Sequence, residues 1–78
     1  MKIKLNIAND VNEFAQICRR SFRENIEVRQ GRYVVNGKSV MGLFSLNLLN
    51  PVEVFIDTDD EYTIYRFKEM IKDWITEE

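Results

Sequence analysis

Residues Asn36 to Leu46 read NGKSVMGLFSL and carry the most specific pattern of the chain. Asn-Gly is typical of a tight turn, and Ser39 follows where a hydroxyl can cap the first free amides of a helix. Apolar residues then recur at helical spacing, at Val40, Leu43, Leu46 and Leu49. We expect a short helix of about two to three turns between Ser39 and Leu48, because Gly42 disfavours a longer one.

The residues upstream of this stretch predict three strands. Lys2–Ile7 alternates strictly between polar and apolar residues, which is typical of a half-buried strand. Its apolar face would consist of Ile3, Leu5 and Ile7. Two further alternating segments, around Ile26–Val28 and Tyr33–Val35, flank the turn residues Gln30-Gly31 and predict a β-hairpin.

An amphipathic helix is expected between the first strand and the hairpin. Its apolar stripe consists of Val11, Phe14, Ala15, Cys18 and Phe22. Asp10 and Glu13 have the spacing of a capping box at its start. Because Cys18 belongs to the stripe, it is predicted to be a small buried core residue.

Downstream, Asn50-Pro51 interrupts the chain, and residues 52–57 alternate as a fourth strand with apolar groups on both faces. Thr58 and Glu61 again have capping-box spacing. An apolar stripe follows and predicts the longest helix of the chain, on Ile64, Phe67, Ile71 and Trp74.

The predicted order is therefore β-α-β-β-α-β-α within one domain, residues 1–78. Four strands with one apolar face, and helices to cover that face, describe a two-layer α+β sandwich. Antiparallel pairing is expected for the hairpin. The periodicity leaves the order of the strands in the sheet open.

The chain contains no histidine, which removes the Ser-His-Asp and Cys-His triads, histidine metal sites and phosphohistidine chemistry. The acidic run Asp57–Glu61 lacks the glycine-centred loop of a calcium site and fits the start of a helix better. We therefore expect no enzymatic activity, no cofactor and no metal.

Several features point to a protein of the cytoplasm. Cys18 is the one cysteine, so no internal disulfide can form, and no apolar run approaches the roughly 18 residues that span a bilayer.

Residues 1–39 carry a net charge of +4 and residues 40–78 one of −6, which together give the −2 of the chain. Despite the arginines at 19, 20 and 23, a pI of about 5.1 argues against nucleic-acid binding.

The expected short helix offers a surface for a protein partner. Val40, Met41 and Phe44 are expected to lie away from the core side of the helix and, with Lys38 at their border, to form a small apolar docking patch. A phosphate on Ser39 would sit at the first turn, where negative charge is tolerated. Without phosphate, Ser39 is explained by capping alone.

The stretch Asn36–Leu46 resembles the regulatory-serine motif of the HPr family, the small phosphocarrier proteins of the bacterial sugar phosphotransferase system. That motif reads N-x-K-S-[IV]-M-G-x-[MF]-S-L, and residues 36–46 match it at every position. The resemblance extends at the level of pattern over nearly the whole chain. It implies an open-faced β-sandwich, with a four-stranded antiparallel sheet in the order 1-4-2-3 that is covered on one face by three helices.

The chain departs from the family at the start of the first helix. Phosphate-carrying members have G-[IL]-H-A-R-P-A there, whereas this chain reads Ile7-Ala8-Asn9-Asp10-Val11. Ile7 or Ala8 stands where the phosphoacceptor histidine belongs, and the shortened loop leaves the choice between them open. The arginine and the proline are also absent. The resemblance therefore implies a divergent member without phosphocarrier activity, similar to catabolite-repression paralogues.

Two functions remain open at this point. In the first, the protein is a regulatory interaction module of phosphotransferase type, a monomer or weak homodimer. Its Ser39 would be phosphorylated by an HPr kinase/phosphorylase-type enzyme, and its patch would bind a transcriptional regulator or a phosphotransferase-related enzyme. In the second, it is an HPr-shaped structural or small-molecule-binding module unrelated to sugar phosphotransfer.

Overall fold

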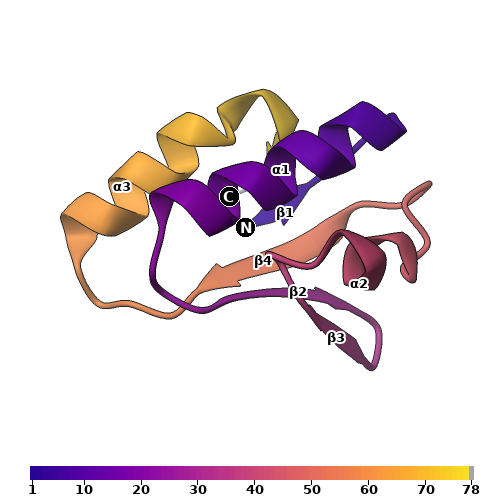
Figure 1. The fold of residues 1–78 in the computed structure, drawn as a ribbon, viewed down its shortest axis with the longest axis horizontal. Coiled ribbons are helices and arrows are strands. Elements are labelled where there is room, and N and C mark those ends of the chain that lie inside the picture. The colour runs from indigo at the N-terminus through magenta and orange to yellow at the C-terminus, as the bar shows by residue number, and fades with distance from the viewer. Residues whose placement is uncertain (78) are drawn as a thin grey trace.

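The computed structural model describes residues 1–77 as one layer of strands covered by helices (Figure 1). The elements, in chain order, are β1 (Lys2–Ile3), α1 (Ala8–Ser21), β2 (Ile26–Gln30), β3 (Tyr33–Asn36), α2 (Val40–Phe44), β4 (Val52–Ile56), α3 (Glu61–Met70), a 3₁₀ turn η1 (Lys72–Trp74) and β5 (Ile75–Glu77). No helix in this part of the chain is long and apolar enough to cross a membrane.

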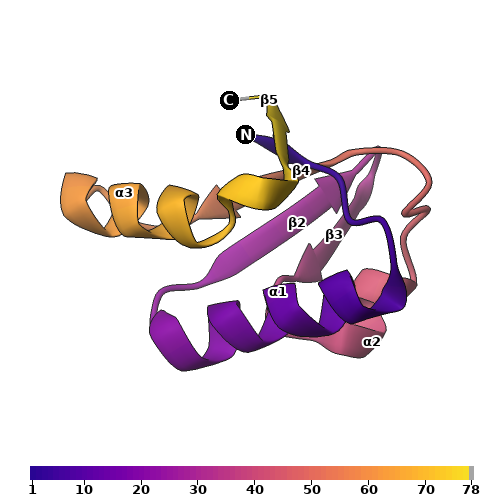
Figure 2. The same cartoon turned by 90° about the horizontal axis from the view of Figure 1, so that it is seen from above.

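The sheet is antiparallel, in the order β3-β2-β4-β1-β5. The expectation of a four-stranded sheet is therefore wrong: β5 pairs with β1 and adds a fifth strand at that edge. The other four strands lie as β1-β4-β2-β3 within the larger sheet. Helices α1 and α3 run side by side, and α2 lies beside α1 and β3 (Figures 1 and 2). The architecture is the expected α+β one with three helices.

The core lies between the sheet and the helices and is entirely apolar within the described chain. Three ring pairs bring α1 and the C-terminal segment together: Phe14 with Phe67, Phe14 with Trp74, and Phe22 with Phe67, at centroid distances of 6.5, 6.1 and 5.3 Å. The predicted stripe of the first helix is fully buried, Cys18 included. Burial raises the pKa of the Cys18 thiol to about 12, so the thiol stays protonated at neutral pH.

The start of the chain differs from the prediction. β1 ends at Ile3, and Ile7 is exposed instead of lying on the buried face with Ile3 and Leu5. Helix α1 already begins at Ala8, so Asp10 lies in its first turn and does not precede it. The reason is that the Asp10 carboxylate turns back and accepts hydrogen bonds from two loop amides, Asn6 and Ile7.

The two later helices are shorter than expected. α2 has five residues, and Leu46 to Leu49 lie outside it. Two hydrogen bonds between Gln30 and Asn47 hold this segment beside the end of β2, and Leu49 is exposed there. α3 has ten residues against fourteen in α1, so α1 is the longest helix. Asp60, and not Thr58, caps α3 by accepting from the Thr63 amide. The chain leaves the helix after Met70 because Ile75–Glu77 finds a strand partner in β1.

Candidate functional site

Ser39 is the N-cap of α2, as the sequence predicts. Its Oγ accepts a hydrogen bond from the Gly42 amide at 3.0 Å. The preceding turn is fixed twice by Asn36, whose side-chain oxygen accepts from the Lys38 amide and whose carbonyl accepts from the Ser39 amide. Ser39 is half-buried. The local structure therefore gives this serine a complete structural role before any modification is considered.

Arg19 reaches this turn from α1. Its guanidinium donates to the carbonyl of Lys38 at 3.0 Å. A cation is thus held one residue from Ser39 by a contact that the sequence pattern did not predict, because it joins positions 19 residues apart. The Ser39 turn has two basic residues beside it, Arg19 and Lys38.

The expected docking patch is only partly as predicted. Met41 is 86% exposed and Phe44 is 48% exposed. Val40 is different: it is half-buried and packs against the core. The physical reason is its position three residues before the buried Leu43, which places both side chains on the same helix face.

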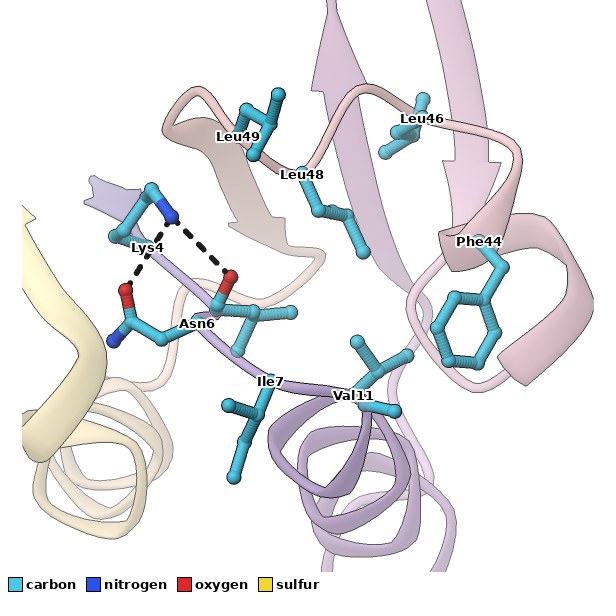
Figure 3. A pocket seen from close by; sticks show the side chains of 10 residues that line it. Lys4, Asn6, Ile7, Val11, Phe44, Leu46, Leu48 and Leu49 are labelled. Carbon is cyan, nitrogen blue, oxygen red and sulfur yellow. Dashed lines mark hydrogen bonds between the residues drawn. The ribbon is translucent and has the colours of Figure 1, made fainter.

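Phe44 belongs to a larger feature that the sequence did not reveal. A hollow of about 300 Å³ opens where the loop before α1 meets α2 and the loop after it (Figure 3). We call it the apolar hollow, and it is lined by Lys4, Leu5, Asn6, Ile7, Ala8, Val11, Phe44, Leu46, Leu48 and Leu49. Phe44 and Leu48 point toward Val11 across the hollow (Figure 3). It therefore joins the Ile7-Ala8 position to the expected docking helix.

One charged residue lines the hollow. The Lys4 ammonium donates to the Asn6 side chain at 3.3 Å and to the Leu5 carbonyl at 3.5 Å, both drawn in Figure 3. The apolar groups at the rim are exposed, with Ile7 at 61% and Leu49 at 85%. A hollow of this kind suits an apolar side chain that has an anionic or carbonyl group next to it.

The wall formed by Leu46 to Leu49 is held by Gln30 at the end of β2. The Gln30 amide nitrogen donates to the Asn47 carbonyl, and the Asn47 amide donates to the Gln30 side-chain oxygen, both at 2.7 Å. We call this pair of bonds the Gln30–Asn47 clamp. The sequence pattern indicates Gln30 only as a turn residue and puts Leu49 on the apolar period of the short helix, whereas Leu48 is half-buried and Leu49 is exposed at the hollow. The only signal in the sequence is an apolar run stopped by Asn50-Pro51.

The start of α1 carries a carboxylate and no histidine. Ile7 is its N-cap and Ala8 its first residue, so neither candidate position offers a nucleophile. The hydrogen bond from the Asn6 amide, assisted by that from Ile7, holds the pKa of the Asp10 carboxyl below its usual value. A fixed negative charge therefore already occupies this helix start, where it interacts favourably with the helix dipole.

The acidic run of residues 57–61 is not brought together as a cation site. Asp60 is engaged as the cap of α3, and its pKa is lowered mainly by the hydrogen bond from the Thr63 hydroxyl. Among residues 1–77, no group of three or more His, Cys, Asp or Glu residues is placed to hold a metal ion.

Comparison with known proteins relates this geometry to one solved structure. No family model matches the sequence, and no curated protein matches it. The crystal structure of HPr-C-His from Thermoanaerobacter tengcongensis does match, with a TM-score of 0.73 and 27% sequence identity over 100% of this chain and 96% of that chain. The chain has an HPr-like fold.

Proposed function

We propose that this chain is an HPr-like regulatory interaction module of the cytoplasm that binds a protein partner and carries no phosphate on its first helix. The function is docking and not catalysis. The observation that carries the proposal is the apolar hollow, which gathers exposed apolar groups from the start of α1, from α2 and from the following loop. Exposed apolar groups gathered in one place are typical of a binding surface.

The chemistry of the hollow favours a particular kind of anchor. Phe44, Leu48 and Val11 would take up an apolar side chain of the partner, and Lys4 at the border would pair with a carboxylate beside that side chain. An HPr kinase/phosphorylase-type enzyme is the first partner to test, and a transcriptional regulator or a phosphotransferase-related enzyme is the next. Met41, exposed on the same helix, extends the surface.

The docking proposal is tested by titrating the purified chain against a purified HPr kinase/phosphorylase-type enzyme. Phe44→Asp should weaken binding at least about tenfold, because it places a charge against a desolvated anchor. Tyr62→Asp is the matched control, since Tyr62 is an exposed aromatic residue on α3 and lies outside the hollow. Equal affinities of the two variants would argue against docking through the hollow.

The absence of phosphocarrier activity follows from the same helix start. The Asp10 carboxylate would repel a phosphoryl anion, and the histidine-free chain offers no acceptor like that of the HPr family. Incubation with phosphoenolpyruvate and the general phosphotransferase enzyme should leave the mass unchanged while authentic HPr gains one phosphoryl group. An acid-labile phosphoryl adduct on this chain would contradict the proposal.

Control by phosphorylation is proposed at Ser39. Two neighbouring cations, Arg19 and Lys38, favour a dianion there, and the α2 cap tolerates negative charge. An HPr kinase/phosphorylase should modify Ser39 and leave Ser21 and Ser45 unmodified, as read by mass spectrometry of peptides. If authentic HPr is modified and Ser39 is not, Ser39 is only a cap. The protein would then be an HPr-shaped module with a task outside sugar phosphotransfer.

A further inference from the structure

The free edge of the sheet at β3 differs from the edge at the other side. β3 consists of Tyr33, Val34, Val35 and Asn36 and carries no charge within the strand. Tyr33 and Val34 are 67% and 57% exposed. Native edge strands are usually protected by charges, prolines or bulges. β5, at the opposite edge, has an irregular register against β1 and ends in Glu77, whereas β3 pairs regularly with β2 over four residues.

The hydrogen bonds of the hairpin show which backbone groups of β3 are unused. The Gly37 amide donates to the Ile26 carbonyl at 2.8 Å, so position 37 faces β2. Because antiparallel positions alternate, positions 35 and 33 also face β2, while positions 34 and 36 face away from it. The Asn36 carbonyl confirms this alternation, since it accepts from Ser39 on the outer side. Val34 therefore presents both an N–H and a C=O at the open edge.

We propose that β3 pairs antiparallel with β3 of a second copy of this chain, joining two five-stranded sheets into one. The register places Val34 opposite Val34 of the second copy. A two-fold axis at this point makes the single donor and single acceptor of Val34 complementary to those of the second copy. The Asn36 amide adds a donor that faces Arg32 of the second copy.

Charge favours a second copy as the occupant of this edge. In this register, Arg32 of one copy lies in the same row as Asn36 and Glu27 of the other, because Glu27 is the register partner of Asn36. The Glu27 carboxylate is already bound through Oε2 to Arg29 of its own chain at 2.7 Å, so Arg32 of the second copy would approach its other oxygen. Two strand spacings, about 10 Å between Cα atoms, separate the opposite charges, which long side chains can span. The two-fold axis repeats this arrangement on the other side. The contact is short, well below the roughly 800 Å² per partner of stable complexes, so the dimer is weak and reversible.

Sedimentation velocity tests this pairing in the purified chain. Between about 10 μM and about 1 mM the sedimenting mass should shift from monomer toward dimer. Val34→Pro removes the outward N–H and no inward one, and Val34→Lys places a charge on the edge, so each should weaken dimerisation at least about tenfold. Leu49→Lys is the matched control, because it adds the same charge at an exposed apolar residue of the hollow.

Amide hydrogen exchange gives a second measurement. It uses the unmodified chain, so it does not require that the Val34 variants fold. The Val34 amide should become protected as the concentration rises, whereas the Val35 amide should be protected at every concentration. The proposal is overturned if the chain stays monomeric up to about 1 mM. A dimer that Leu49→Lys dissolves and Val34→Lys leaves intact would also overturn it, and would place the contact at the hollow.

Discussion

Asp10 should make the stability of the candidate site depend on pH. Its carboxylate accepts from the Asn6 and Ile7 amides and so fixes the loop that forms one side of the apolar hollow. These bonds are made by the ionised form. The pKa of Asp10 is therefore lower in the folded chain than its ordinary value of 3.8.

The stabilising effect of this carboxylate should be complete above pH 3.8 and should be lost as the pH falls through the lower pKa of the folded chain. Asp10→Asn should therefore reduce the loss of unfolding free energy below pH 4, measured by urea titration at a series of pH values. The pKa of Asp60 is also lowered in the folded chain. Protonation of Asp60 should therefore still cause part of the loss of unfolding free energy in acid in the Asp10→Asn variant. Asp59→Asn, at an exposed position, serves as the control.

Leu46 and Phe44 test which side chains of α2 and the loop after it belong to the core. Leu46 is 7% exposed and belongs to the core, whereas Phe44 stands at the hollow. Leu46→Ala should lower the unfolding free energy by about 2–5 kcal/mol, the usual range for a buried leucine. Phe44→Ala should cost clearly less and should mainly weaken partner binding. Equal losses of stability in denaturant titrations would mean that the two side chains are equally part of the core.

The Gln30–Asn47 clamp should hold the loop between α2 and β4 in place. Gln30→Ala removes both bonds at once. Since the groups left behind can reach water, we expect a loss of about 1–2 kcal/mol. The Asn47 amide should exchange faster by hydrogen-exchange NMR. Gln16→Ala, at an exposed glutamine of α1, should change neither quantity, and no change in Gln30→Ala would show that the loop is held by its leucines alone.

Elements with strong internal periodicity could be predicted from the sequence, and their ends could not. The stripe from Val11 to Phe22 predicts α1 because every member faces one core. The spacing of Asp10 to Glu13 predicts a cap that precedes the helix, whereas the Asp10 carboxylate lies in the first turn and accepts from the Asn6 and Ile7 amides. Likewise, Ile75–Glu77 becomes a strand because β1 offers a free edge, and helical spacing carries no information about that edge.

The candidate site is assembled from segments that are far apart in the sequence. Ile7 and Leu49 share the hollow although they are 42 positions apart in the sequence, and the sequence pattern could indicate each segment but not their meeting. The strand order could be expected only through resemblance to the HPr family. The α+β architecture followed from the patterns themselves, because alternating strands with one apolar face require a covering layer.

Stability should be distributed unevenly over the sheet. β2 pairs with β4 over four residues and with β3 over four, whereas β1 contributes two residues to each of its pairings. In native-state hydrogen exchange, the amides of Glu27 and Phe55, which by the alternation of antiparallel positions face each other between β2 and β4, should therefore open only with global unfolding, and those of β5 by local opening. Exchange of β5 amides at the global rate would show that the fifth strand belongs to the cooperative core.

The turn before Ser39 also bears on how the protein ages. Asn-Gly sequences lose ammonia when the glycine nitrogen attacks the asparagine side-chain carbonyl and closes a succinimide ring. Water then opens this ring, mainly to isoaspartate, which has an extra methylene in the backbone. Here the Gly37 nitrogen is held by its bond to the Ile26 carbonyl, and the Asn36 side chain is held by the Lys38 amide. Deamidation at Asn36 should therefore proceed only through opening of the hairpin end. Long storage of the folded chain should leave this position intact, while the unfolded chain in urea accumulates isoaspartate there.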